Sequence, residues 1–136
     1  LHLTFLNMLS LRRETDYALQ ILKILSRQKG SVSLREVAKK SGLSFMFLQK
    51  IARKLRFAGL VKAAHGVKGG YYLALPARRL TLGQVVGAVE GGCVLMPCVT
   101  AKTDCCGKKS CGLKPKVKKL NEQMIKMFAK IKLSDL

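Results

Sequence analysis

Residues 33–59, SLREVAKKSGLSFMFLQKIARKLRFAG, are the stretch that decides the fold we expect for this chain. The first four, SLRE, have the pattern of a capping box, which predicts a helix through Lys40. The SGL that follows predicts a tight turn, because glycine adopts positive φ angles without strain. Ser44 is the expected N-cap of a second helix, from Phe45 to about Ala58. Two helices joined by a short turn that contains glycine indicate a helix-turn-helix.

A β-hairpin is expected directly after these helices, in residues 60–75, LVKAAHGVKGGYYLAL. Two short apolar runs, 60–64 and 71–75, flank a glycine-rich tip, which is the pattern of two antiparallel strands. A hairpin that follows a helix-turn-helix is the wing of a winged helix. On the second helix of the pair, the positions that we expect to face the core are Phe47, Leu48, Ile51 and Leu55.

Further helices complete an expected fold that is mainly α with a small β-hairpin wing. Apolar spacing predicts a helix over 10–28, Thr81 is the expected cap of a short helix through Glu90, and Pro115 suits the first turn of the last helix. This last helix carries a narrow apolar stripe, which is typical of a seam with another helix. We expect it to pair two subunits, although packing on its own domain fits the pattern equally well. The stripe consists of Val117, Leu120, Met124, Phe128 and Ile131.

The chain divides into four expected regions. Residues 1–9 are an N-terminal extension, 10–80 form the winged helix-turn-helix, 81–113 hold a short helix and a cysteine-rich loop, and 114–136 form the dimerisation helix and tail. The opening LHLTFLNML lacks the basic front end and the small-residue cleavage site of a signal peptide. No apolar run approaches the roughly 18 residues of a membrane-spanning helix. We therefore expect a cytoplasmic protein without a membrane partner.

Basic residues dominate the charge of the chain. Lysine and arginine number 26 against seven aspartates and glutamates, a formal net charge of +19. This excess favours a polyanion partner, because each neutralised phosphate releases condensed counterions. With a helix-turn-helix, the expected partner is double-stranded DNA, bound at a palindromic operator by a homodimer. An enzyme is not expected, since the chain lacks a phosphate loop, a Cys-x-x-Cys pair and a catalytic carboxylate motif.

The helix from Phe45 is the expected recognition helix, whose first residues would contact base edges in the major groove. Glutamine can pair with adenine through two hydrogen bonds, and lysine or arginine can reach guanine or phosphate. The candidates on this helix are Ser44, Phe45, Met46, Gln49, Lys50 and Arg53. Candidates on the wing are Lys62, His65 and Lys68. Further candidates for phosphate contacts are Arg12, Arg13, Ser33 and Arg35.

All five cysteines lie between Cys93 and Cys111, in a segment without helical or strand periodicity. Such a long segment inside a small domain is usually either functional or disordered, and five thiols favour function. In the cytoplasm, clustered cysteines are metal ligands or redox thiols rather than structural disulfides. An iron–sulfur cluster suits several thiolates on one loop. A dithiol switch is an alternative, because nearby lysines favour thiolates, and a zinc site is less suited to these spacings.

Several motifs resemble those of one family, the bacterial winged-helix regulators that include the iron–sulfur cluster regulator IscR and the nitric-oxide-sensitive repressor NsrR. The resemblance covers roughly residues 8–134. Its motifs are TDYAL at 15–19, LRFAGLV at 55–61, GVKGGY at 66–71, VEG at 89–91 and the spacing Cys98-x6-Cys105-x5-Cys111. The stretches MLSLR at 8–12 and LSDL at 133–136 look most like the subgroup that regulates the SUF cluster-assembly system.

The resemblance implies an iron–sulfur cluster, either [2Fe–2S] or [4Fe–4S]. The implied cysteine ligands are Cys98, Cys105 and Cys111. IscR-type relatives take a fourth ligand from a histidine three residues after the last cysteine, where this chain has Lys114. Asp16 matches an aspartate that NsrR-type relatives supply from the other subunit, and Cys106 is the alternative fourth ligand. The competing interpretation of Asp16 is a carboxylate that stabilises the start of its helix.

The expected function is a DNA-binding transcriptional regulator, more specifically a repressor, whose operator binding responds to iron–sulfur status, redox state or nitric oxide. The alternative is a winged-helix regulator whose cysteines form a cluster-free thiol switch or a zinc site. Cys93 lies where relatives carry an apolar residue, so we expect it in the core. His65 stands where relatives place an arginine in the minor groove, and histidine is the weaker cation at neutral pH.

Overall fold

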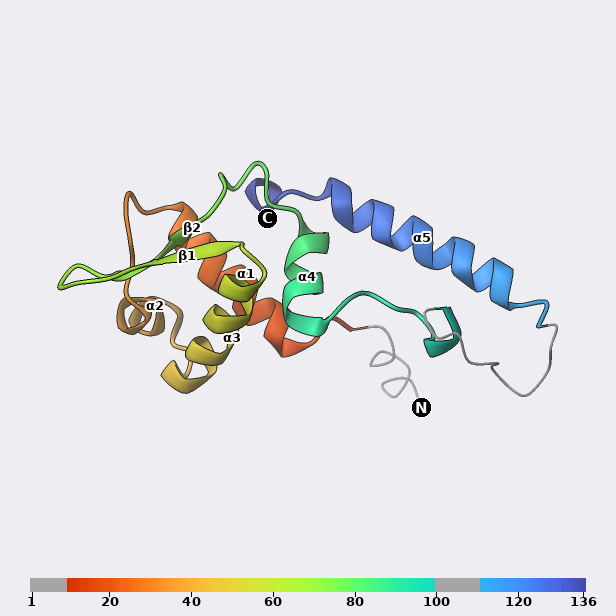
Figure 1. The fold of residues 1–136 in the computed structure, drawn as a ribbon, viewed down its shortest axis with the longest axis horizontal. Coiled ribbons are helices and arrows are strands. Elements are labelled where there is room, and N and C mark those ends of the chain that lie inside the picture. Colours follow the sequence, from red (N-terminus) through yellow and green to blue (C-terminus); the bar gives the residue numbers. More distant parts are fainter. Residues whose placement is uncertain (1–9, 100–110) are drawn as a thin grey trace.

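The computed structural model describes residues 10–99 and 111–136, and over these ranges it is mainly helical, with a two-stranded hairpin that projects at one end beside α2 (Leu34–Ser41) (Figure 1). The elements in chain order are α1 (Arg13–Ser26), α2 (Leu34–Ser41), α3 (Phe45–Phe57), β1 (Val61–Ala64), β2 (Gly70–Leu73), α4 (Leu82–Glu90), the 3-10 turn η1 (Pro97–Val99), α5 (Lys114–Lys130) and the 3-10 turn η3 (Leu133–Asp135). The predicted fold, mainly helical with a small antiparallel hairpin and a C-terminal helix, is confirmed. In the part of the chain described, no helix is long and apolar enough to cross a membrane.

α2 and α3 form the predicted helix-turn-helix. Ser33 is the N-cap of α2, and its side-chain oxygen accepts a hydrogen bond from the Glu36 N–H at 3.2 Å. The capping box is only half formed, because the Glu36 carboxylate pairs with Lys40 at 2.7 Å. α2 ends at Gly42, whose φ of +69° is the left-handed conformation that glycine adopts without strain. Ser44 occupies the N-cap position of α3 as predicted, but its side chain makes no capping hydrogen bond.

Two other helix starts follow the sequence pattern closely. The Gln84 N–H donates to Thr81 Oγ1 at 3.2 Å, and the Thr81 N–H donates to Gln84 Oε1 at 2.9 Å, so α4 begins with a complete capping box. Pro115 occupies the first turn of α5, where a missing N–H costs no helical hydrogen bond. These local signals set where both helices begin.

The wing is an antiparallel hairpin in which Val61 pairs with Leu73. A bridge to the segment before α2 holds its base: the Val32 N–H donates to the Tyr71 carbonyl at 2.9 Å, and the Tyr71 N–H donates to the Val32 carbonyl at 2.8 Å. This close approach requires glycine at position 70, because a Cβ there would lie 2.3 Å from the Val32 carbonyl oxygen. The wing is therefore joined directly to the helix-turn-helix.

The core lies where α1, α3 and α4 meet. Its buried residues at helical spacing are Ala18, Ile21, Leu22 and Leu25 of α1, Leu48, Ile51 and Leu55 of α3, and Val85 and Val89 of α4. Burying each of the larger aliphatic side chains contributes roughly 1.5–3 kcal/mol relative to exposure. Phe47 departs from the prediction, since its side chain is half exposed and its ring meets Tyr17 edge to face, with ring centroids 5.8 Å apart. The core-facing side of α3 is therefore narrower than the sequence pattern predicts.

α5 is anchored at its C-terminal end and extends away from the winged helix (Figure 1). The Leu82 N–H donates to the Ile131 carbonyl at 2.9 Å, and the Leu133 N–H donates to the Leu80 carbonyl at 2.8 Å. Leu133 is buried in the shared core. One end of α5 is thus fixed to the start of α4, while its other end lies next to the cysteine segment.

Candidate nucleic-acid interface and cysteine segment

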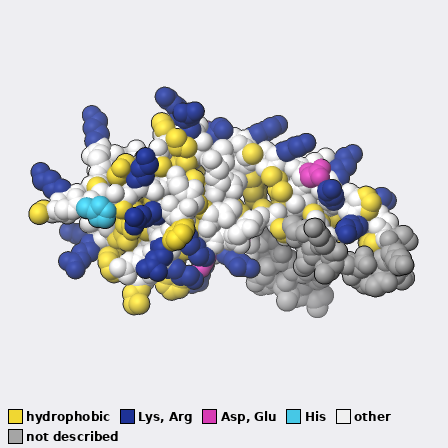
Figure 2. Space-filling view, in the orientation of Figure 1, with side chains coloured by type: hydrophobic (Ala, Val, Ile, Leu, Met, Phe, Trp, Pro, Cys, Tyr) yellow, Lys and Arg dark blue, Asp and Glu magenta, His cyan; other side chains and the backbone are white. Residues whose placement is uncertain are grey.

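The outer face of α3 carries the residues that the sequence predicts for base contacts. All six are exposed: Ser44, Phe45, Met46, Gln49, Lys50 and Arg53. They alternate at helical period with the buried residues of α3, so they project away from the core. Figure 2 shows lysine and arginine side chains gathered over the end of the molecule that holds the wing, α2 and α3, with few acidic side chains in view.

A hollow of about 440 Å³ opens between α2, α3 and the base of the wing. It is lined by Leu34, Gln49, Lys50, Arg53, Arg56 and Tyr71. Three of the predicted DNA contacts meet here, and Arg56 adds a cation that sequence analysis did not select. One amide and three cationic side chains around an open hollow can contact base edges and phosphate oxygens.

The starts of α1 and α2 carry the other predicted phosphate contacts. Ser33 satisfies one N–H of the first turn of α2, and the remaining N–H groups, with the positive end of the helix macrodipole, favour an anion. Arg35 is exposed in the same turn. Arg12 and Arg13 are exposed at the start of α1, so their side chains are accessible to phosphate.

The wing exposes all three of its predicted contacts. Lys62 lies on β1, and His65 and Lys68 lie in the tip between the strands. The Ser31 hydroxyl donates to the Lys68 carbonyl at 2.7 Å, which ties the wing to the segment before α2. Two lysines and a histidine are therefore held in a defined position relative to α3.

Five residues connect α1, α3 and α4 through side-chain contacts, and we call this group the α1–α3–α4 junction. Its members are Glu14, Lys50, Lys54, Val89 and Glu90. Lys50 Nζ donates to Glu14 Oε1 at 2.7 Å, and Lys54 Nζ donates to Glu14 Oε2. Lys54 Nζ also donates to the Val89 carbonyl at 2.8 Å. The hydrogen bonds from Lys50 and Lys54 lower the pKa of Glu14 from 4.5 to about 2. Lys50, a predicted DNA contact, is therefore held from α1.

Glu90, the last residue of α4, joins the same junction to the start of α1. Its Oε1 accepts a hydrogen bond from the Arg12 N–H at 2.8 Å and another from the Thr15 hydroxyl. Arg12 is the N-cap position of α1, so this carboxylate satisfies a free N–H and complements the positive end of the macrodipole. Gly91 then ends α4 with a φ of +81°, and the cysteine segment begins.

The first part of the cysteine segment runs back along α5 toward the N-terminus of that helix. Cys93 Sγ lies 3.8 Å from Met124 Sδ, and the Leu95 N–H donates to Asn121 Oδ1 at 2.9 Å. Asn121 is buried, although asparagine is usually exposed, because it holds this backbone. This alignment directs η1 toward the first turns of α5, and η1 contacts that helix.

Cys98 and Cys111 thus come to the same end of α5. Cys98 lies in η1, and Cys111 precedes α5, with its carbonyl accepting from the Lys114 N–H at 3.2 Å. Both side chains are partly exposed. Cys105 and Cys106 lie outside the described residues, and within residues 10–99 and 111–136 no three His, Cys, Asp or Glu side chains are grouped to hold one metal ion. The donor chemistry fits an iron–sulfur cluster, because soft thiolates are its usual ligands.

The start of α5 is electrostatically suited to an anionic group. Its first six residues, KPKVKK, include four lysines and no acid. The positive end of the helix macrodipole points toward Cys111 and adds to this charge. Because thiolate ligands bring negative charge, a cluster held by Cys98 and Cys111 would offset a repulsion that otherwise destabilises the start of the helix.

Cys93 and Asp16 differ from the other candidate ligands in their surroundings. Cys93 is partly buried, and burial together with the Glu90 charge raises the pKa of its thiol. It packs against Met124 but is not part of the buried core, so the prediction of a core position is wrong. Asp16 is exposed on α1, where both of its oxygens accept from the Gln20 side chain at 3.1 Å. This position is that of a carboxylate near the start of a helix, and its exposure leaves it accessible to other molecules.

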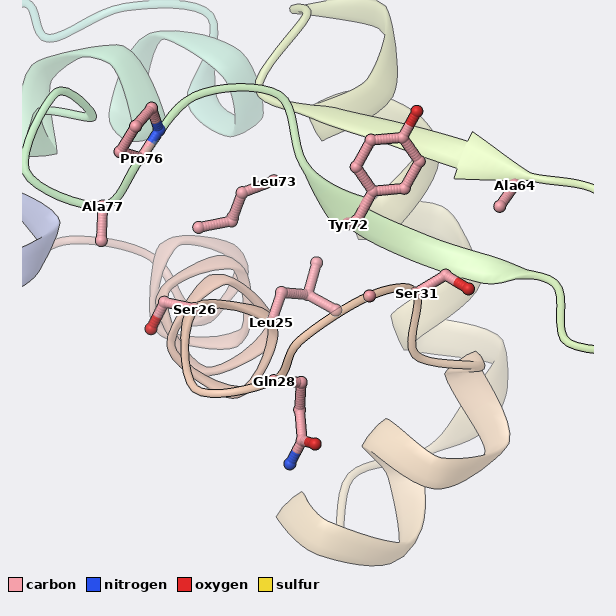
Figure 3. Close-up of a pocket in the computed structure, with 10 residues that line it drawn as sticks. Leu25, Ser26, Gln28, Ser31, Ala64, Tyr72, Leu73, Pro76 and Ala77 are labelled. Carbon is pink, nitrogen blue, oxygen red and sulfur yellow. The ribbon is translucent and has the colours of Figure 1, made fainter.

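Two further hollows have different linings. One, of about 540 Å³, lies between the start of α1, the residues after α4, and α5; its polar and sulfur-containing side chains are those of Ser10, Arg12, Glu90, Cys93, Met124 and Met127. The other, of about 600 Å³, lies between the end of α1 and the wing, where Figure 3 shows Leu25, Leu73 and Tyr72. No charged residue, histidine or cysteine is among the residues that line this second hollow, so it has no carboxylate, imidazole or thiolate ligand for a metal and no cation for phosphate.

Comparison with known proteins identifies the family. The model of the family Rrf2, described as an iron-dependent transcriptional regulator, matches residues 11–136. The chain belongs to the Rrf2 family. The predictions of a DNA-binding transcriptional regulator and of a protein that is not an enzyme are thereby confirmed.

Individual proteins match this chain to different extents. Protein aau3 of Rhizobium meliloti is 32% identical over 128 residues, 93% of this chain and 83% of aau3. The HTH-type transcriptional regulator IscR of Vibrio vulnificus is 36% identical over 87 residues, 64% of this chain and 51% of that protein, so the match spans about half its length. Among solved structures, T. potens IscR has a TM-score of 0.71 at 29% identity, covering 93% of this chain and 85% of that one. CymR of B. subtilis, the global cysteine regulator, has a TM-score of 0.72 at 23% identity, covering 93% and 95%, which supports the Rrf2 fold.

Sequence reasoning selected the exposed cations and missed the residues that hold them in place. The missed residues are Glu14, Lys54, Arg56, Glu90 and Asn121. Glu14, Lys54, Glu90 and Asn121 make hydrogen bonds to residues that are between 26 and 78 positions away in the chain. No local sequence pattern therefore indicates these contacts. The one available signal was the scarcity of acids: with only seven in the chain, each glutamate near a lysine-rich helix was a candidate for a specific ion pair.

Proposed function

We propose that this Rrf2-family chain is a repressor that binds a palindromic operator as a homodimer, under the control of an iron–sulfur cluster in the cysteine segment. The cysteine ligands are Cys98, Cys105 and Cys111. The fourth is the partner subunit's Asp16 or, alternatively, Cys106. The observation that carries the proposal is the course of the segment along α5, which brings Cys98 and Cys111 to one lysine-rich helix end.

Different residues of the chain would have different roles in such a sensor. The cluster, when bound, supplies a group whose charge and ligands change on oxidation, nitrosylation or loss. The thiols hold it, the lysines at the start of α5 balance its charge, and Asn121 keeps the incoming backbone on α5. The resemblance of both ends of the chain to the SUF-regulating subgroup makes cluster-assembly genes the proposed targets.

Pairing of two subunits through α5 is part of the proposal. Leu113, Leu120 and Met127 recur every seven residues and are 67%, 55% and 54% exposed. Spacing of this kind is typical of a seam between two helices. The other members of the predicted stripe are partly buried, with α4 and η1 packed against α5; they are Val117, Met124, Phe128 and Ile131. We therefore place the centre of the seam at Leu120, between Leu113 and Met127.

Anaerobic absorption spectroscopy tests the cluster. Wild-type protein should absorb in the visible range after anaerobic purification or reconstitution, and Cys98→Ala and Cys111→Ala should abolish this absorbance. Cys93→Ala is the matched control, since it removes a thiol from the same segment but from a packing position, and it should keep the absorbance. A wild-type protein that stays colourless after reconstitution would refute the cluster and favour the thiol switch or zinc site.

The fourth ligand and the DNA response need two further comparisons. Loss of absorbance in Asp16→Ala but not in Cys106→Ala would assign the aspartate, and the opposite result would assign the cysteine. Fluorescence anisotropy with a duplex that carries an inverted repeat should give affinities for the loaded and unloaded protein that differ by roughly 5- to 150-fold. A duplex of equal length without the repeat is the control, and equal affinities for the loaded and unloaded forms would contradict the proposed regulation.

A further inference from the structure

The α1–α3–α4 junction links the end of α4 to a side chain on the DNA face. The Val89 carbonyl accepts from Lys54 at 2.8 Å, Lys54 pairs with one oxygen of Glu14, and the other oxygen of Glu14 accepts from Lys50 at 2.7 Å. Lys50 lines the hollow between α2, α3 and the wing. Val89 is four residues before Cys93, the first cysteine of the segment. The series of contacts therefore begins beside the cysteine segment and ends where DNA would bind.

One carboxylate shared by two lysines makes the two ion pairs dependent on each other. Glu14 bears a single negative charge between two ammonium groups, so a stronger interaction with one weakens its hold on the other. Displacement of the Val89 carbonyl removes one of the two acceptors that Lys54 has in the structure. Lys54 then interacts with Glu14 alone and more strongly. Because this weakens the pair between Glu14 and Lys50, the Lys50 ammonium group becomes more available to phosphate or to a base edge.

The end of α4 borders a hollow. This hollow of about 540 Å³ is lined by Glu90, Gly91, Gly92 and Cys93, so the side of the helix end that faces it is not covered by packed side chains. The Glu90 carboxylate also holds the start of α1 through the Arg12 N–H and the Thr15 hydroxyl. A rearrangement of the cysteine segment would therefore reach both partners of the Glu14–Lys54 pair.

We propose that Glu14 and Lys54 are positioning residues that transmit the state of the cysteine segment to Lys50 on the recognition helix. This inference rests on the proposed function, because it takes the cysteine segment to be the sensor. Neither residue needs to touch DNA for this role. Their effect is on the orientation and availability of Lys50.

Two substitutions separate transmission from simple DNA contact. Lys54→Met keeps a long apolar side chain but removes the bonds to Val89 and Glu14, so that Glu14 pairs with Lys50 alone whatever the position of the Val89 carbonyl. It should change the affinity of the unloaded protein for operator DNA by less than about threefold while abolishing the response to loading. Glu14→Gln keeps the shape of the side chain but releases both lysines, so DNA affinity should rise in both states, with a salt dependence steeper by roughly one phosphate contact.

The matched control is Glu36→Gln, which also removes one negative charge. Glu36 pairs with Lys40 at 2.7 Å within α2, so this ion pair does not connect two helices. The readout is the ratio of operator affinities in the loaded and unloaded states, measured by anisotropy for all four proteins. We expect this ratio to fall below about twofold in Lys54→Met and Glu14→Gln, and to keep the wild-type value, roughly 5–150, in Glu36→Gln. Circular dichroism confirms folding, and amide hydrogen exchange of α3 in the unloaded protein should increase in Lys54→Met.

The outcomes distinguish this inference from the proposed function. A wild-type ratio well above one that persists in both junction variants would overturn the transmission role and leave the cluster-controlled regulator standing. A wild-type ratio of one would overturn both. Loss of the ratio in Glu36→Gln as well would show that the effect is one of net charge, which also overturns the inference.

Discussion

Replacing Gly70 by alanine tests how the wing is joined to the helix-turn-helix. The added Cβ would lie 2.3 Å from the Val32 carbonyl oxygen and 2.7 Å from the Ser33 backbone nitrogen, whereas ordinary contact begins at 3.4 Å. The atoms it meets are backbone, so no side chain can rotate away. The two segments must therefore separate by about 1 Å.

This separation breaks the bridge between Val32 and Tyr71. Its two hydrogen bonds measure 2.8 and 2.9 Å, and an extra ångström takes both beyond the range of a useful N–H···O bond. Each such bond contributes about 0.5–1.5 kcal/mol net. We expect Gly70→Ala to lower the free energy of unfolding by about 2 kcal/mol and to weaken operator binding, because the lysines of the wing move relative to α3.

Urea unfolding followed by circular dichroism measures the first effect, and anisotropy measures the second. Gly87→Ala is the matched control, because a Cβ at this exposed position of α4 meets nothing within 4 Å. Alanine is the better helix former, so this variant should be more stable by about 0.5–1 kcal/mol. An unchanged stability of Gly70→Ala would refute the packing of the wing described above.

Four other outcomes are open to measurement. The pKa of Glu14 is lowered from 4.5 to about 2, so the stabilisation from its ion pairs is complete above about pH 4.5 and is lost as the pH falls toward 2. The lysine partners are 57% and 35% exposed, which limits the strength of these pairs. The difference in unfolding free energy between wild type and Glu14→Gln should therefore be about 1 kcal/mol at neutral pH and should vanish in acid. Cys93, whose thiol pKa is raised by burial, should react with iodoacetamide more slowly than a peptide thiol at neutral pH, as measured by mass spectrometry, and an equal rate would contradict its packed position. Leu120→Asp should convert dimers to monomers in sedimentation equilibrium, whereas Glu122→Gln should not. Arg56→Gln should weaken binding to operator and unrelated DNA alike and reduce the slope of log K against log salt by roughly one, and a sequence-dependent loss would show instead that Arg56 contacts a base.

Much of the fold could be predicted because its signals are local. The capping residues Ser33 and Thr81, the glycine of the turn and the glycine-rich wing tip act on neighbouring residues, so the sequence alone places the helices and the hairpin. The exposed cations of α3 and the wing follow from the same periodicities. Phe47 shows the limit of this reasoning: its spacing fits the core, but the space between α1 and α3 leaves its ring half exposed against Tyr17.

The candidate site depended more on tertiary structure. The spacing of the cysteines indicates a cluster loop, but it does not say where the loop goes. Only the contacts of Cys93 with Met124 and of Leu95 with Asn121 direct Cys98 back to the start of α5. Of the predicted stripe on α5 only Leu120 is exposed, and the other members are partly buried, because the position of α4 and η1 decides which apolar residues are covered.

What the sequence by itself determined was the set of helices, the wing, the strongly basic surface and the clustered thiols, all of which follow from residue type and short-range spacing. What only the tertiary structure decided was the partnership of Glu14 with Lys50 and Lys54, and the meeting of α1, α3 and α4 next to the cysteine segment. These partners are 35 to 40 residues apart in the chain. An ion pair depends on the distance between its charges, and that distance is set by how the helices pack rather than by any local pattern.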